Sequence, residues 1–232
     1  ALVAMIGKNS VSEVTVTLPK GNTMKLEIKR CNFDSNQAEC IIIKDAGDDP
    51  DVTHGAEIVS TVTWTDDVGM IEIEGGKGVG KVTKPGIGLD IGKPAINPTP
   101  MKMITNAVKE VASEQLKTKG VRVIISVPKG EELAKLTDNP RLGIVGGVSI
   151  LGTSGIVLPY STGSFTASIR QSLDVAKAMG EDTVVLTTGG RSEDFAKELL
   201  KLPEHSYIQM GDFAAYSVRQ ALIRNMKKVI IA

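Results

Sequence analysis

Two patterns of apolar and polar positions divide this chain near its middle. Up to about residue 140, short runs alternate between apolar and polar residues, as half-buried β-strands do. Val11–Leu18 and Met24–Ile28 are two such runs, and the turn between them predicts a hairpin. A helix is expected just after Pro98 and Pro100, where apolar residues recur at helical spacing. Further strands are expected at Cys40–Lys44, Ala56–Thr65, Met70–Glu74 and Val121–Val127.

From residue 141 onward, apolar strands alternate with amphipathic helices. The expected strands are continuous apolar runs, typical of a parallel sheet that is buried on both faces. The sequence therefore predicts a strand-rich α+β domain over 1–140, followed by a Rossmann-like three-layer α/β domain with a parallel sheet over 141–232. The boundary is expected near Asn139–Pro140. The expected strands are Thr183–Thr187, Tyr207–Met210 and Val229–Ile231, and the expected helices are Ser164–Met179, Ser192–Leu200 and Phe213–Met226.

Charge and composition narrow the classes of partner. Lys and Arg number 27, as do Asp and Glu, so the zero net charge gives no reason to expect nucleic acid or an anionic membrane as a partner. No apolar run approaches the roughly 20 residues that span a bilayer. With two cysteines and two histidines, a metal site built by the protein is not expected. Cys31 and Cys40 are either two ordinary thiols or, if they lie on neighbouring strands, partners in a bridge.

Both ends of the chain are expected to continue into further structure. Ala1–Ile6, followed by Gly7, has the pattern of the last turns of a helix, and Val229–Ile231 has that of a strand with no turn after it.

A glycine-rich stretch with lysines, Gly75–Lys84, is a candidate anion site. Glycines let backbone N–H groups approach a ligand closely, and Lys77, Lys81 and Lys84 add positive charge. The spacing is not that of a P-loop, because no Ser or Thr follows the lysines. Gly78 lies between the first two lysines as a candidate contact. The alternative is a flexible hairpin loop with solvated lysines.

Two other stretches carry candidate chemistry in the first 160 residues. Lys44–Gly55 contains Asp45, Asp48 and Asp49, which can hold a cation, orient a ligand or act as bases; ordinary turn chemistry is the alternative. Gly143–Pro159 contains five glycines among apolar residues, which suggests backbone packed against a flat ligand or another element. The candidate ligand contacts there are Gly152, Thr153 and Ser154.

A third candidate site lies where expected strands of the second half end. The turn Thr188–Ser192 joins a parallel strand to a helix, the place where α/β folds bind ligands. Asp212 follows the next strand and can either hold a ribose or cap the next helix. The candidate cofactor contacts are Gly189, Gly190, Arg191 and Asp212.

Taken in chain order, these motifs resemble one family, the cobalt-precorrin-5B carbon-1 methyltransferases of anaerobic cobalamin biosynthesis. The matching stretches are Lys44–Gly55, Gly75–Pro85, Pro94–Pro100, Gly143–Pro159, Ser168–Gln171 and Gln209–Gly211. The resemblance implies that a methyl group moves from S-adenosylmethionine to ring carbon 1 of a cobalt-containing corrin precursor. It also implies a further segment before residue 1 and a further α/β unit after residue 232.

The resemblance implies a small cobalt-corrinoid as the partner and a cytoplasmic location. It implies neither a nucleic acid nor a membrane as a partner, and oligomerisation stays open. Cobalt comes with the substrate, so no protein-bound metal is expected. A fringe of acid groups on the corrin suits Lys77, Lys81 and Lys84. The site is expected in a cleft between the domains, with the cofactor at the turn Thr188–Ser192 or, alternatively, at Gly143–Gly155. The alternative hypotheses of function are a nucleotide-dependent α/β enzyme and a non-catalytic corrinoid-binding protein.

Overall fold

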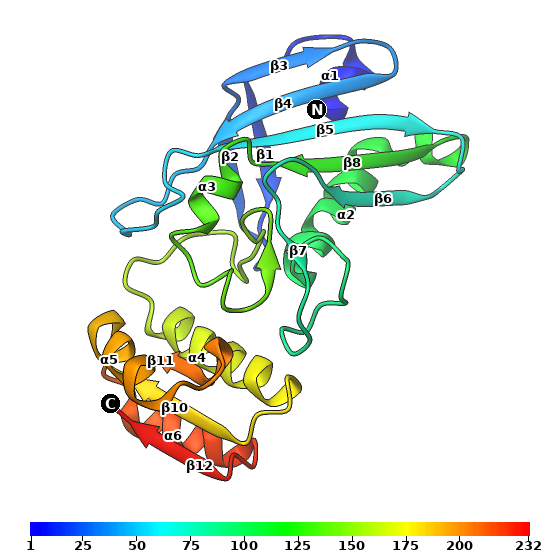
Figure 1. Cartoon of the computed structure of the whole chain (residues 1–232). Helices are drawn as coiled ribbons and strands as arrows, with labels where there is room; N and C mark the ends of the chain where they lie inside the picture. The colour runs from blue at the N-terminus through cyan, green and yellow to red at the C-terminus, as the bar shows by residue number, and fades with distance from the viewer. The chain divides into compact units, whose positions relative to one another are not determined.

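The structure is a computed structural model that describes residues 1–232, and the chain forms two compact units (Figure 1). The chain passes between the units at several points, one of which is the expected position Asn139–Pro140. The short exchanged segments had no signal in the sequence pattern. The N-terminal unit comprises Ala1–Lys81, Pro94–Asn139 and Val145–Pro159, and the C-terminal unit comprises Val82–Lys93, Pro140–Ile144 and Tyr160–Ala232.

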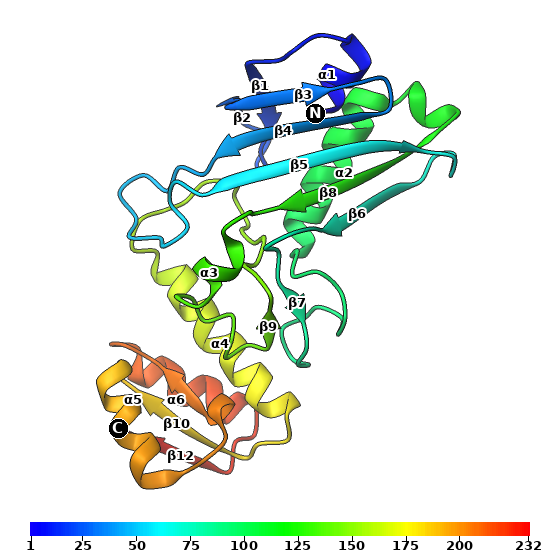
Figure 2. The same ribbon diagram turned by 45° about the horizontal axis from the view of Figure 1, so that its top comes forward.

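The larger sheet belongs to the N-terminal unit and has the strand order β3-β4-β5-β8-β6 (Figure 2). Neighbouring strands pair antiparallel, except that β6 runs parallel to β8. The register places Ala38 opposite Val62 and Val62 opposite Val123, so apolar side chains form a row across one face. The strands are β3 (Arg30–Phe33), β4 (Gln37–Ile43), β5 (Glu57–Thr65), β8 (Gly120–Ser126) and β6 (Ile71–Gly75).

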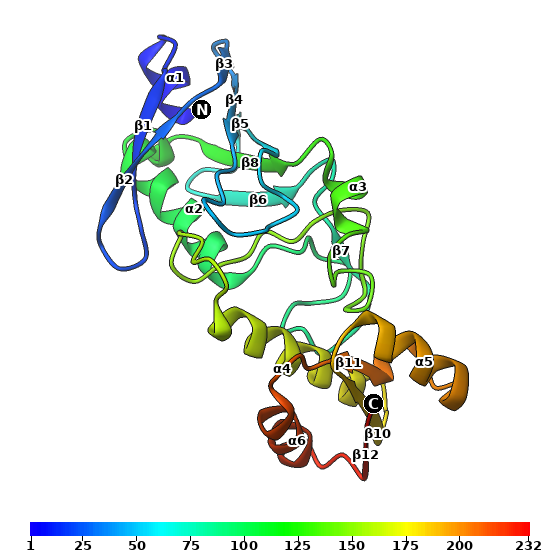
Figure 3. The ribbon, with the colours of Figure 1, turned by 90° about the vertical axis from the view of Figure 1, so that its left-hand side faces the viewer.

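Helices α1 (Leu2–Gly7) and α2 (Pro98–Ala112) cover this apolar face (Figure 3). Leu2 and Met5 of α1 and Val108 of α2 are buried in the same core cluster as the sheet valines. Helix α2 starts at Pro98 itself, because a proline's fixed φ and missing N–H suit the first turn of a helix. The opposite face is charged at its edge, where Arg122 pairs with Glu72 at 2.7 Å.

Smaller elements complete the N-terminal unit and its links. The expected hairpin is present as an antiparallel pair. These elements are β1 (Glu13–Thr17), β2 (Thr23–Glu27), α3 (Gly130–Ala134), the mutually paired two-residue strands β7 (Lys81–Val82) and β9 (Ile144–Val145), and the 3₁₀ turn Gln115–Lys117.

The C-terminal unit is a three-layer α/β structure around a parallel sheet of order β11-β10-β12. Helices α4 and α6 pack on one face through Ile169, Leu173 and Ala221, whereas α5 packs on the other through Ala196 (Figure 3). The predicted fold class is therefore confirmed. The elements are α4 (Thr162–Ala178), β10 (Thr183–Thr187), α5 (Gly190–Leu200), the 3₁₀ turn Glu204–Ser206, β11 (Tyr207–Gln209), α6 (Ala214–Ile223) and β12 (Lys228–Ile231).

None of the helices is long and apolar enough to cross a membrane.

Glycine backbones meet at very close range in the N-terminal unit. A Cβ placed on Gly130 would lie 2.0 Å from the carbonyl oxygen of Gly78, and one on Gly147 would lie 2.1 Å from the same atom. A Cβ on Gly78 itself would lie 1.9 Å from the carbonyl oxygen of Val127. No side chain fits at these points, so the glycines allow three backbone segments to pack together.

This packing predicts a selective loss of stability. Gly130→Ala should destabilise the N-terminal unit by about 1–3 kcal/mol, because the new methyl group overpacks the backbone. Gly7→Ala is the matched control, since a Cβ there meets nothing within 4 Å. Urea unfolding followed by the fluorescence of the single Trp64 measures both. Equal unfolding midpoints for the two variants would contradict the packing argument.

A buried carboxylate organises the C-terminal unit. The Glu193 side chain is 1% exposed and pairs with Arg141 at 2.6 Å and with Lys197 at 2.7 Å. Gln209 donates a further hydrogen bond to it at 2.9 Å. Burial alone would raise the pKa of Glu193, but the contacts with Arg141, Lys197 and Gln209 together lower it below its ordinary value. The carboxylate thus stays charged in the folded protein.

Because the pKa of Glu193 is lowered in the folded protein, the stability that its contacts with Arg141, Lys197 and Gln209 supply depends on pH. The stabilisation is fully present above the ordinary carboxyl pKa of 4.5 and is lost as the pH falls through the lowered value. Glu193→Gln should cost roughly 1–3 kcal/mol at neutral pH and should reduce the loss of stability on acidification. Circular dichroism melts at pH 7 and pH 3 test this, with exposed Glu198→Gln as control. An unchanged acid dependence in Glu193→Gln would rule out this role.

Candidate functional site

The turn after β10 lies at the carboxyl edge of the parallel sheet. Gly189 precedes the first residue of α5, and a Cβ on Gly189 or on Gly190 would meet nothing within 4 Å. The space in front of the turn is therefore open. The first N–H groups of α5, those of Gly190 and Arg191, have no acceptor within the helix and can bind an oxygen of a ligand.

Ser192 holds the shape of this turn. Its hydroxyl oxygen accepts hydrogen bonds from the backbone N–H groups of Thr188 at 3.1 Å and Gly189 at 3.2 Å. The hydroxyl donates in turn to the carbonyl oxygen of Gly189 at 3.0 Å. Ser192 thus bonds back from the first turn of α5 to Gly189, which occupies the cap position, and no side chain fills the space beside the two glycines.

Asp212 lies at the same edge, because β11 is the parallel neighbour of β10. Met210 N–H donates to the carbonyl oxygen of Thr187, which joins the ends of the two strands. The Asp212 carboxylate is exposed and makes no hydrogen bond or ion pair. The alternative role of Asp212 as a helix cap is wrong, since Phe213 occupies the position before α6 and no side chain caps that helix. Asp212 is therefore available to a ligand.

An aromatic pair lies beside this carboxylate and was not predicted from the sequence. Phe165, in the first turns of α4, stacks on Phe213 with ring centroids 5.4 Å apart. Phe165 is 39% exposed, and Gly211 lies close against its ring. Farther along α4, Arg170 donates to the hydroxyl of Tyr216 on α6. The only signal in the sequence was that an aromatic residue directly follows Gly211 and Asp212.

The lysine and glycine stretch is divided by the fold. Lys77 and Lys81 are exposed in the N-terminal unit, and neither side chain has a hydrogen-bond or ion-pair partner. Gly78 between them is buried and packs closely against neighbouring backbone. The two free cations remain available to an anion.

Lys84 belongs to the C-terminal unit and has a structural role there. Its side chain packs against Gly143, and its Nζ donates to the carbonyl oxygen of Arg141 at 3.2 Å. Thr83 makes a parallel contact, donating to the carbonyl oxygen of Gly143 at 2.7 Å. Lys84 therefore supports the segment that carries the Arg141–Glu193 ion pair.

The acidic stretch forms the loop between β4 and β5. Asp45 and Asp48 are exposed, and Asp49 lies partly buried beside them. The loop is organised by other residues: the Lys44 ammonium contacts both Asp51 and Thr53. Burial opposes ionisation of Asp51, but its bonds to Lys44 and Thr53 outweigh this and lower the pKa of Asp51. His54 Nδ1 also accepts the N–H of Ala46 at 3.1 Å.

The segment Gly143–Pro159 has two parts with different environments. Ile144, Gly147 and Val148 are buried, whereas the part from Leu151 onward is an exposed loop. Gly152 and Thr153 are exposed, and Ser154 Oγ donates to the carbonyl oxygen of Ile156 at 2.9 Å. Apolar side chains are exposed along this loop at Leu151, Ile156 and Leu158.

The predicted site residues thus fall into separate groups. The structure brings Gly189, Gly190, Arg191 and Asp212 to one edge of the small sheet. Lys77, Gly78 and the 152–154 loop belong to the N-terminal unit. The expected position of a site in a cleft between the two domains stays a prediction.

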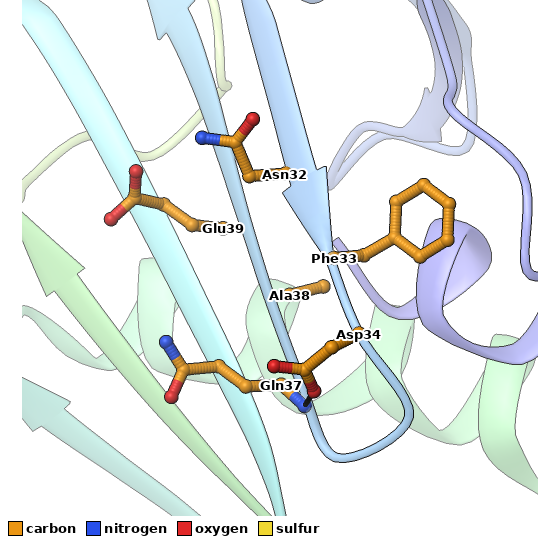
Figure 4. A pocket seen from close by; sticks show the side chains of 6 residues that line it. All are labelled: Asn32, Phe33, Asp34, Gln37, Ala38 and Glu39. Carbon is orange, nitrogen blue, oxygen red and sulfur yellow. Dashed lines mark hydrogen bonds between the residues drawn. The ribbon is translucent and has the colours of Figure 1, made fainter.

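Other features of the molecule do not coincide with these groups. No three His, Cys, Asp or Glu side chains are arranged to hold a metal ion. A shallow pocket of about 280 Å³ lies on the β3–β4 hairpin and contains none of the predicted site residues (Figure 4). Its lining residues are Asn32, Phe33, Asp34, Gln37, Ala38 and Glu39.

The curated proteins to which this chain is similar agree with one another in name. Curated proteins from Geobacillus kaustophilus (strain HTA426) and Priestia megaterium are each 50% identical over 230 residues, 99% of this chain, and both are named "Cobalt-precorrin-5B C(1)-methyltransferase". The chain spans 62% of the length of each of these relatives. The crystal structure of cobalamin biosynthesis protein (cbiD) from Archaeoglobus fulgidus matches with a TM-score of 0.52 and 27% identity, covering 100% of this chain and 72% of that one.

The sequence model of a protein family gives the same assignment. The model described as CbiD matches residues 1–159, which include the acidic loop, the lysine and glycine stretch and the segment ending at Pro159. This match covers more than half of the chain and agrees with the likeness, over 99% of this chain, to the curated relatives. The chain therefore belongs to the CbiD family.

Proposed function

We propose that this protein transfers a methyl group from S-adenosylmethionine to ring carbon 1 of cobalt-precorrin-5B. The observation that carries the proposal is 50% identity, over 99% of this chain, to proteins named for that reaction. A cytoplasmic location and a cobalt-corrinoid as the small-molecule partner belong to the same proposal. Cobalt enters as part of the substrate.

The open edge of the C-terminal sheet supports the placement of the cofactor. The strand order β11-β10-β12, with all strands parallel, is the arrangement in which α/β proteins bind ligands beside the central strand. The turn at Gly189–Gly190 presents N–H groups to an oxygen, Asp212 presents a free carboxylate to ribose hydroxyls, and Phe165 offers a ring on which a base can stack. All three kinds of contact lie within one unit.

The N-terminal unit supports the placement of the corrin substrate. Lys77 and Lys81 are unpaired cations that can bind the acid groups on the fringe of the macrocycle. The loop with Leu151, Ile156 and Leu158 exposes apolar surface that suits the flat ring. Gly152, Thr153 and Ser154 lie in the same loop and can contact the macrocycle through backbone and hydroxyl groups.

These residues would act by binding and orientation. The methyl donor is a sulfonium ion that is already activated, so holding it in line with the acceptor carbon supplies most of the catalysis. The apolar loop would exclude water from the reacting atoms. Asp45, Asp48 and Asp49 stay candidates for a general base, and among them the two most exposed are Asp45 and Asp48.

Calorimetric titration of the full-length gene product tests the cofactor placement. We expect S-adenosylmethionine and S-adenosylhomocysteine to bind and ATP not to bind. Asp212→Asn should weaken the first two by roughly ten- to a hundredfold, because a charged acceptor of two hydroxyl groups is lost. Asp138→Asn, an exposed change in the other unit, should have no effect.

Each outcome of this titration separates the alternatives. Unchanged affinity in Asp212→Asn would eliminate that residue from the site. Binding of ATP in place of S-adenosylmethionine would favour a nucleotide-dependent enzyme. Binding of a corrinoid without any binding of S-adenosylmethionine would favour a non-catalytic corrinoid-binding protein.

Kinetics at two salt concentrations test the substrate placement. Replacing Lys77 and Lys81 together by Ala should raise KM for the corrin roughly three- to thirtyfold at low salt. This range follows because each exposed ionic contact contributes about 0.3–1 kcal/mol to binding and two contacts are lost. The effect should shrink at high salt, where exposed charges are screened. Lys102→Ala, at an exposed position on α2, is the matched control. A KM that does not depend on salt in either protein would argue against these lysines.

A further inference from the structure

Cys31 and Cys40 face each other across two paired strands. Strand β3 is the edge strand of the five-stranded sheet, and its register with β4 places Cys31 directly opposite Cys40. The Cys40 S–H donates to the sulfur of Cys31 at a distance of 2.8 Å. The two cysteines therefore lie on neighbouring strands, which is the condition for a bridge between them.

The hydrogen-bond pattern of the hairpin brings these two residues especially close. Asp34 N–H bonds to the carbonyl oxygen of Gln37. This bond continues the β3–β4 register one step beyond its last pair, Phe33 opposite Ala38. Because bonded and non-bonded pairs alternate along an antiparallel ladder, the Cys31–Cys40 pair is a non-bonded one. Such pairs have Cα atoms about 4.5 Å apart, within the range of about 4.4–6.8 Å that a disulfide spans. This spacing is compatible with a disulfide between the two residues.

The two thiols differ in their access to solvent. Cys40 is 6% exposed and lies on the face of the hairpin that holds Ala38, a member of the core with Leu2 and Met5 of α1. Figure 4 shows that Phe33 and Ala38 point to the side opposite Asn32 and Glu39. Cys31 is only partly buried, so a small reagent can reach it from the edge of the sheet. Burial and the bond with Cys31 raise the pKa of the Cys40 thiol, which favours Cys31 as the first to react.

We propose that Cys31 and Cys40 are a redox-active pair that forms a reversible intrachain disulfide with a small-molecule disulfide as the oxidant. The Cys31 thiolate attacks one sulfur of oxidised glutathione, forms a mixed disulfide and releases one glutathione thiolate. Cys40 loses its proton to solvent and attacks the Cys31 sulfur, which releases the second glutathione thiolate. The two protein thiols are oxidised by two electrons, and the small disulfide is reduced to two thiols.

The bond would fix the edge strand to its neighbour. It closes a loop between residues nine positions apart and joins β3 to β4, while leaving the rest of the sheet unchanged. Opening of the hairpin should then become slower. This modification site is independent of the proposed methyl transfer, because neither cysteine belongs to the residues that the proposal uses.

Titration with oxidised glutathione, followed by alkylation and mass spectrometry of the full chain, tests the proposal. Trypsin cuts after Arg30 and Lys44, so both cysteines fall in one peptide, Cys31–Lys44. In the wild type we expect both free thiols to disappear and this peptide to become lighter by two hydrogen atoms, with reversal by dithiothreitol. Amide exchange in the hairpin should slow by at least about tenfold in the oxidised protein.

Single variants test the order of the two steps. Cys40→Ser should keep one glutathione on Cys31, because the second thiol is missing. Cys31→Ser should leave Cys40 unmodified, since Cys40 is buried. The proposal is overturned if the wild type accumulates glutathione adducts or remains fully alkylatable at glutathione ratios that oxidise a control dithiol. Because the wild type alone gives this answer, a variant that fails to fold does not weaken the test.

Discussion

Parallel pairing of β10 with both of its neighbours returns the chain to one edge of the small sheet after each strand. The turn at Gly189–Gly190 and the turn at Gly211–Asp212 therefore meet there, although they are far apart in the sequence. The buried Glu193, held by Arg141, Lys197 and Gln209, links the helix after the first turn to the strand before the second. The proposed cofactor site of this unit depends on that geometry.

The N-terminal unit uses its glycines differently. Gly78, Gly130 and Gly147 allow backbone segments to approach at distances that no side chain permits, so the glycine-rich motif is mainly a packing device. The charged groups that remain exposed beside Gly78 are the unpaired side chains of Lys77 and Lys81. In the proposed function, these two lysines bind the acid groups of the substrate.

Local patterns predicted the elements well, because alternation and helical spacing report directly on which face is buried. Strand Thr183–Thr187 has the same bounds in the sequence prediction and in the structure. Strand Arg30–Phe33 was missed, since four residues with polar neighbours carry too little pattern. Contacts between distant segments were also invisible: neither the packing around Gly78 nor the stack of Phe165 on Phe213 leaves a trace in local spacing. The sequence did not show that Asp212 leaves the next helix uncapped, because this depends on where that helix begins.

Hydrogen exchange of the full-length protein, with and without S-adenosylhomocysteine, tests the placement of the cofactor most directly. We expect protection on binding to be concentrated at residues 187–192 and 209–214, the two turns at the carboxyl edge of the small sheet. The glycine-rich segment 143–155 should change little. Protection confined to 143–155, with no change at the two turns, would contradict the placement of the cofactor at these turns and would favour the 143–155 segment instead.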